Sequence, residues 1–291
     1  MLRWEGLQKS VARYAATAAM MLICSGSPGE SGSKVRAEAE RAERVGAHDR
    51  AIELYSTAFG DASISNAERR DILKRRARLN ERINQIDRAL GDWSGAISIE
   101  PVDPVLYASR GFLFLRLRRY DDALADFAKG TALDEKSATY AYGTGRVHSD
   151  RQHYAEAISS YTKAITLDGN HATAYLWRGK AYIAQHSYRD ARLDFERVLA
   201  LNHQLLPSQQ GRFYLGLGFV RMKTNEFALA LTDLDKGLGI LPNNLNGLRA
   251  RAFVLETLGD RKRALKDYDR ILDLKADDSW ALERRSQLQV R

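Results

Sequence analysis

A single pattern returns along most of this chain at intervals close to 34 residues. It combines a small residue, an alanine twelve positions later and a large ring four positions after that, as in Gly111, Ala123 and Phe127. A fixed interval of about 20 to 50 residues indicates a stacked repeat protein, because one unit of that size cannot bury its own apolar face. The repeat therefore constrains the fold more than any other feature.

Seven copies share one register and begin at residues 32, 70, 104, 138, 172, 211 and 245. The eighth position of each copy is small: Ala39, Ala77, Gly111, Gly145, Gly179, Gly218 and Ala252. The twentieth is always alanine: Ala51, Ala89, Ala123, Ala157, Ala191, Ala230 and Ala264. The twenty-fourth is a ring in all copies but one: Tyr55, Trp93, Phe127, Tyr161, Phe195, Leu234 and Tyr268. We expect the small positions to let two helices approach closely, and the ring to fill the space beside them.

These positions resemble the tetratricopeptide repeat (TPR) family, whose unit is a helix–turn–helix of about 34 residues. The resemblance covers about residues 32–278. It implies an all-α fold, a right-handed superhelical solenoid of about seven repeats over residues 34–278, with a C-terminal capping helix at residues 279–291. The first and fifth copies are longer than 34 residues, and we expect the extra residues, at 60–65 and 203–207, to form longer connections.

The N-terminal residues differ from the repeats in composition. Arg3, Lys9 and Arg13 precede an apolar run at residues 15–24, and small residues follow it. A basic start, a short apolar core and small residues predict a secretory signal peptide at residues 1–27. The run is also shorter than the about 20 residues that span a bilayer.

This signal peptide predicts a periplasmic or secreted protein; the alternative is a cytoplasmic adaptor that retains the segment. Residues 28–33, rich in glycine and serine, are expected to form a flexible linker. Cys24 is the only cysteine, so no internal disulfide can form. The cleavage site and lipidation of Cys24 stay open.

The sequence shows no pattern typical of catalysis or cofactor binding. The six histidines form no His-Glu-x-x-His motif, and neither a phosphate-binding loop nor a Gly-x-Ser-x-Gly elbow occurs. The acidic pair Asp121-Asp122 lies at an expected helix start, where capping explains it. We therefore expect no enzyme, no metal, no cofactor and no small-molecule substrate.

The TPR resemblance implies that the first helix of each repeat lines a concave groove, mainly through positions two, five, nine and twelve. The candidate groove residues on this chain are Phe112, Tyr142, Arg146, Leu176, Trp177, Lys180, Arg212, Phe219, Arg249 and Phe253. Rings interleaved with cations suit a protein or peptide partner with apolar and acidic groups. Some of these side chains, Trp177 above all, have the alternative of packing within the solenoid. No copy has lysine at position five with asparagine at position nine, so the resemblance does not extend to the carboxylate-clamp TPR proteins.

Residues 69–82 concentrate positive charge in a chain whose formal net charge is +8. The candidate basic patch comprises Arg70, Lys74, Arg75, Arg78 and Arg82. One interpretation is a solvated face that is partly neutralised by acids three or four residues away. The other is a docking patch for an acidic partner, anionic lipid or another polyanion, although nucleic acid is not the partner we expect.

The leading prediction is a non-enzymatic scaffold for protein–protein interaction, exported to the bacterial cell envelope. The identity of the partner, the pathway and the oligomeric state do not follow from the sequence.

Overall fold

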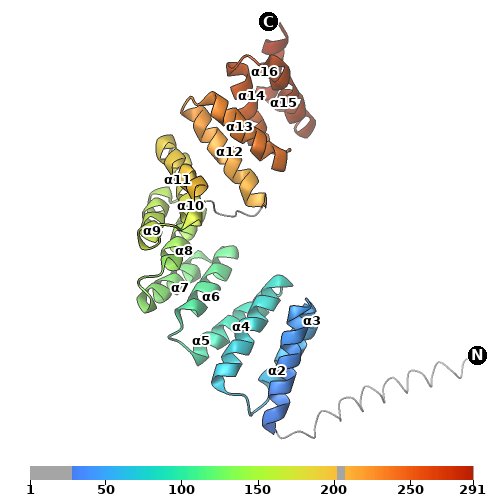
Figure 1. The fold of residues 1–291 in the computed structure, drawn as a ribbon, viewed down its shortest axis with the longest axis vertical. Helices are drawn as coiled ribbons and strands as arrows, with labels where there is room; N and C mark the ends of the chain where they lie inside the picture. Colours follow the sequence, from blue (N-terminus) through green and yellow to red (C-terminus); the bar gives the residue numbers. More distant parts are fainter. Residues whose placement is uncertain (1–27, 202–206, 291) are drawn as a thin grey trace, which may run out of the picture. The chain divides into compact units, whose positions relative to one another are not determined.

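The computed structural model describes residues 28–201 and 207–290, which form fifteen α-helices and no β-strand (Figure 1). The first helices of the seven repeats are α2 (Pro28–Arg44), α4 (Asn66–Arg82), α6 (Pro104–Arg116), α8 (Ala138–Asp150), α10 (Ala172–Ala184), α12 (Pro207–Lys223) and α14 (Leu245–Thr257). The second helices are α3 (His48–Phe59), α5 (Ile86–Ile99), α7 (Tyr120–Leu133), α9 (Tyr154–Leu167), α11 (Tyr188–Ala200), α13 (Phe227–Ile240) and α15 (Arg261–Leu274). The last helix is α16 (Ser279–Val290). The predicted all-α repeat solenoid is confirmed.

The helices fall into two compact units, Met1–Arg119 with α2–α6 and Tyr120–Arg291 with α7–α16. The boundary lies between the two helices of the third repeat. Among the described helices, none is long and apolar enough to cross a membrane. The predicted signal peptide, residues 1–27, lies outside the described residues.

The start of the solenoid differs from our prediction. Residues 28–33, which we expected to form a linker, belong to α2. Gly32 is buried there against Asp61, and an added Cβ would lie 2.9 Å from the carboxyl carbon of that aspartate. The glycine thus serves close packing of the helix end rather than flexibility, and the folded region begins before the predicted residue 34.

Residues 60–65 form the connection between α3 and α4, as predicted, whereas Pro207 begins α12 and residues 202–206 lie outside the described residues. Four of the first helices begin where the register predicts, but α2, α4 and α12 begin four residues earlier and are 17 residues long. Part of the extra length therefore adds a helical turn, besides the predicted connection at residues 60–65. The N-cap of α4 is Ser65, which forms a reciprocal capping box with Glu68.

In repeats four and five, the ring of the second helix packs against the small residue of the first. An added Cβ at Gly145 would lie 2.7 Å from the ring of Tyr161, and one at Gly179 would lie 2.6 Å from the ring of Phe195. Both rings are fully buried. The predicted close approach of the two helices is confirmed at these positions.

A second feature accompanies the ring and was not predicted. Wherever the ring carries a hydrogen-bond donor, the twelfth position of the repeat offers a polar partner. Four pairs follow this rule: Tyr55 with Glu43 at 2.7 Å, Trp93 with Glu81 at 2.8 Å, Tyr161 with Ser149 at 2.9 Å, and Tyr268 with Glu256. Burial raises the pKa of these tyrosines, which keeps their hydroxyls protonated as donors.

The rule also holds in reverse. Phe195 and Leu234 occupy the ring position of repeats five and six and carry no donor. The twelfth positions of these repeats are Ile183 and Met222, both apolar. A polar side chain at the twelfth position is thus found only where a buried donor needs it.

Ion pairs add a further link between the two helices of a repeat. In repeats two, five and seven, an arginine of the first helix holds a buried aspartate of the second through two hydrogen bonds. These pairs are Arg76 with Asp92, Arg178 with Asp194, and Arg251 with Asp267. Bidentate pairs of this kind fix orientation, and loss of the arginine would leave a buried charge uncompensated.

We predict that Phe195→Tyr destabilises the protein by about 1–3 kcal/mol, because the new hydroxyl would be buried without a partner. The double variant Phe195→Tyr with Ile183→Glu is expected to recover part of this loss, because it recreates the pairing of Tyr268 with Glu256. Urea unfolding of the parent and of the variants, including Ile183→Glu alone, measures both effects. Equal destabilisation in the single and double variants would contradict the proposed coupling.

Candidate partner-binding surface

A cavity of about 830 Å³ lies in the second unit among α10, α12, α14 and α16. We call it the apolar pocket. Its apolar lining comes from Ile183, Leu215, Phe219, Met222, Phe253 and Trp280, and its cations are Arg212, Lys223 and Arg249. Four predicted groove residues, Arg212, Phe219, Arg249 and Phe253, therefore line one cavity.

Two apolar residues of the pocket lining stand at the twelfth position of their repeats. Ile183 and Met222 occupy the twelfth positions of repeats five and six, opposite Phe195 and Leu234. In repeats that carry a tyrosine or tryptophan ring, the same position holds glutamate or serine. The absence of a ring donor in two adjacent repeats therefore permits a continuous apolar surface on their first helices.

Two phenylalanines give the pocket accessible aromatic surface. Phe253 is 41% exposed, although its neighbours in the chain, Ala252 and Val254, belong to a core cluster. Phe219 is half-buried, and its ring centroid lies 6.0 Å from that of Tyr188. The ammonium of Lys223 lies 5.6 Å from the centre of the Phe219 ring. Aromatic surface beside a cation is typical of surfaces that bind a partner.

Trp280 contributes to the pocket from α16, although we predicted only a capping role for that helix. Its ring packs edge-on against Tyr268, with the centroids 5.4 Å apart. A register signal could have identified it: an eighth copy would begin at residue 279, and Trp280 would then occupy the second position, as Arg212 does in repeat six.

Arg249 lines the pocket but has a structural partner. It pairs with the carboxylate of Asp278, which is 2% exposed, and its guanidinium lies 5.9 Å from the centre of the Trp280 ring. Arg249 therefore fastens α14 to the start of α16. Its charge is offset, so Arg212 and Lys223 contribute more of the pocket's positive charge.

A group of cations surrounds Trp177 in the same unit. The guanidinium carbon of Arg146 lies 3.7 Å from the ring centre of Trp177, and the ammonium of Lys180 lies 4.2 Å from it. Arg146 also donates to the hydroxyl of Tyr142 at 3.3 Å. Burial, followed by the charges of Arg212 and Arg146, lowers the pKa of Lys180 to about 8. We call Arg146, Lys180 and Arg212 the cation cluster.

Two predicted groove residues, Leu176 and Phe112, line neither the apolar pocket nor the cation cluster. Leu176 is only 4% exposed and packs in the core cluster with Phe195, so its assignment to the groove is wrong. It falls on the buried side of α10 because it precedes the small residue Gly179 by three positions, on the same helix face. Phe112 belongs to α6 of the first unit and is half-buried there.

The basic patch of the first unit is largely neutralised. Arg75 pairs with Glu43 at 3.1 Å and with Asp71 at 3.2 Å. Arg70 pairs with Glu100, and Lys74 lies 3.5 Å from Asp103. Arg78 and Arg82 are exposed and form no ion pair within the described part of the chain.

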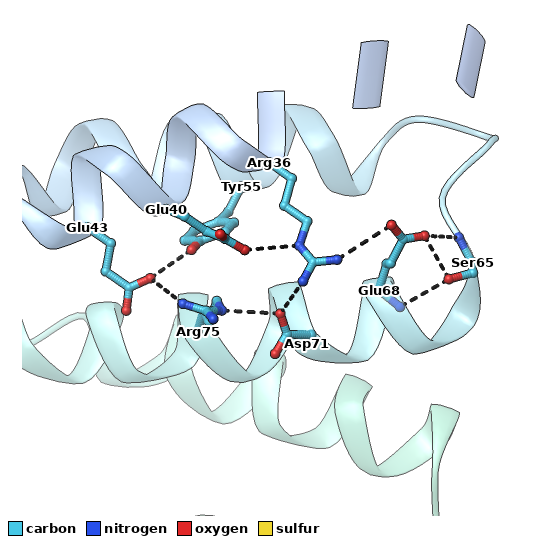
Figure 2. A network of polar contacts seen from close by, with 8 residues as sticks. All are labelled: Arg36, Glu40, Glu43, Tyr55, Ser65, Glu68, Asp71 and Arg75. Carbon is cyan, nitrogen blue, oxygen red and sulfur yellow. Dashed lines mark hydrogen bonds and ion pairs between the residues drawn. The ribbon is translucent and has the colours of Figure 1, made fainter. Parts of the chain in front are cut away.

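Figure 2 shows the network that surrounds Arg75. Arg36 of α2 reaches Asp71 of α4 at 2.8 Å and Glu68 at 3.5 Å, and Glu43 joins Tyr55 to Arg75. The acids come from other helices as well as from α4 itself. The charges of α4 thus serve to join α2, α3 and α4, which favours a neutralised face over a docking patch.

Two family models match the second unit. One, described as a TPR repeat, covers residues 145–186, and the other, described as a tetratricopeptide repeat, covers residues 176–244. The chain carries tetratricopeptide repeats. TPR proteins are generally non-enzymatic scaffolds for protein–protein interaction. Within the described residues, no group of three or more His, Cys, Asp or Glu could hold a metal ion. No curated protein matches the chain in sequence.

Several solved structures share the TPR fold. PilF of Pseudomonas aeruginosa has a TM-score of 0.66 at 18% identity, over 76% of this chain and 99% of that one. A TPR protein of Parabacteroides merdae has a TM-score of 0.63 at 16% identity, over 90% and 100% of the two chains. YrrB, described as a TPR protein with an unusual peptide-binding site, has a TM-score of 0.57 at 20% identity, over 67% and 97%. Identities this low show the fold alone.

We predict a specific pH dependence from Lys180. Because its folded pKa lies below its ordinary value of 10.5, its charge destabilises the fold at neutral pH, and this effect disappears as pH rises from about 8 towards 10. Lys180→Gln should therefore be more stable than the parent at pH 7, with a smaller advantage at pH 9.5. Urea unfolding of both proteins at the two pH values tests this, and a pH-independent difference would contradict it.

Proposed function

We propose that this TPR protein is a scaffold that binds a segment of a partner protein at the apolar pocket and the cation cluster. The observation that carries the proposal is the apolar pocket itself. It exposes aromatic and aliphatic side chains from four helices, and Phe253 remains 41% exposed. Such surface is costly in water and is stabilised when a partner covers it.

The charges around the pocket favour an acidic and apolar segment as the occupant. Arg212 and Lys223 are exposed cations of the lining, and within the described residues neither forms an ion pair. A partner with an aromatic or aliphatic residue next to aspartate or glutamate would complement both features. A purely apolar or a basic segment would leave these cations unmatched.

We predict that displayed random peptides selected on the full chain become enriched in aromatic or aliphatic residues next to acidic ones. Phe253→Ser is expected to weaken binding of the selected peptide by about tenfold or more, because it truncates a central aromatic contact. Isothermal titration calorimetry measures the affinity.

Leu193→Ser is the matched control. Leu193 lies on α11, is 58% exposed and does not line the pocket, so the change removes a comparable apolar side chain elsewhere. Equal loss in the two variants, or enrichment of basic peptides, would refute the pocket as the binding site.

We further propose that the protein is exported and acts in the periplasm or outside the cell. The support is the composition of residues 1–27, in which three basic residues precede a short apolar run. We expect a chain with a C-terminal tag to be recovered from the periplasm, shorter by about 26 residues. The mass of the purified product and the cell fraction test this, and an intact cytoplasmic product would refute it.

A further inference from the structure

Three successive repeats each contribute one cation to the same region of the second unit. Arg146 comes from α8, Lys180 from α10 and Arg212 from α12. None of them forms an ion pair with an acid of the described chain. Residues 202–206, which are not among the described residues, include no aspartate or glutamate.

The part-buried arginines that join the two helices of a repeat, by contrast, have acidic partners. Arg178, which lies between two members of the cluster in sequence, holds Asp194 at 2.7 and 2.9 Å. Arg221 holds Asp233 at 2.6 Å in the next repeat. The fold therefore supplies acids to the arginines that join the two helices of a repeat, and leaves the cation cluster unmatched.

The cluster is also partly removed from water. Lys180 is half-buried, and Nε of Arg146 is buried without an acceptor within the described structure. Arg146 and Lys180 lie 3.7 and 4.2 Å from the same ring centre, so their like charges repel one another, and burial weakens the hydration of Lys180. Two interactions offset part of this cost. Arg146 and Lys180 make cation–π contacts with the ring of Trp177, and Arg146 donates one hydrogen bond to the hydroxyl of Tyr142. Within the described residues, none of their N–H donors has an anionic acceptor.

We propose that Arg146, Lys180 and Arg212 form a subsite for the carboxylate of an acidic side chain in the partner segment. Arg212 lines the apolar pocket as well, so an apolar residue of the same segment can occupy the pocket while its acidic neighbour reaches the cluster. The inference rests on the proposed function for the identity of the partner. The subsite itself is defined by the unmatched cations, and it can be tested without the pocket.

The probe is N-acetylglutamate α-amide, which carries one side-chain carboxylate and no free terminus. In NMR titrations of the full chain, we expect it to shift the indole N–H signal of Trp177, assigned with Trp177→Phe. N-acetylglutamine α-amide, its uncharged counterpart, should leave this signal in place. Absence of a shift with the acidic probe would overturn the subsite, even if selected peptides still bind the apolar pocket.

Variants separate binding from folding. We expect Lys180→Gln to lower the affinity for the acidic probe about tenfold, because it removes a charge-assisted hydrogen bond. Lys163→Gln on α9, where Lys163 is exposed, makes the same change in charge and should have no effect. The melting temperature of Lys180→Gln should rise while its binding is lost, because a desolvated charge is removed. Unchanged affinity in Lys180→Gln would overturn the assignment.

Arg212→Gln gives an independent variant, because Arg212 is exposed and its replacement does not disturb the core. We expect a severalfold loss of affinity for the acidic probe. N-acetylglycine and inorganic phosphate distinguish the source of the anion: tighter binding of either one than of N-acetylglutamate α-amide would overturn the assignment to an acidic side chain.

Discussion

The packing of repeats four to six depends on the contact between a large side chain of the second helix, Tyr161, Phe195 or Leu234, and a glycine of the first helix. At Gly145 and Gly179 the ring leaves no room for even a methyl group. This contact sets how closely the two helices pack, and the apolar clusters between successive helices build on it. Because each repeat is stabilised by its neighbours, a change at one ring affects the local array more than distant repeats.

The chemistry of the ring is also matched by the residue at the twelfth position of the first helix, four residues after the small position and on the same helix face. A tyrosine or tryptophan requires an acceptor at the twelfth position, as Tyr55 requires Glu43. A phenylalanine or leucine has no such requirement. Repeats five and six use Phe195 and Leu234, so Ile183 and Met222 can line the apolar pocket. The residue type at the buried ring position thus goes with a polar or an apolar side chain at the twelfth position of the first helix.

The two regions rich in positive charge have opposite electrostatic environments. Around α4, several cations pair with acids from neighbouring helices. Arg75, for example, contacts both Glu43 and Asp71. The cation cluster meets aromatic rings and, within the described chain, no acid. Counting charges along the sequence favours α4, where basic residues are dense. The cation cluster instead consists of three residues that are far apart in sequence.

The sequence by itself determined the repeat, the pairing of helices and most of their bounds, because small and ring residues recur at fixed spacing and the required packing is local. It also predicted most of the candidate surface, including Phe219 and Phe253. Only the tertiary structure decided that Leu176 is core, that Trp280 joins the pocket, and which cations have partners. These outcomes depend on distances between side chains of different helices, and a periodic pattern in one helix does not specify those distances.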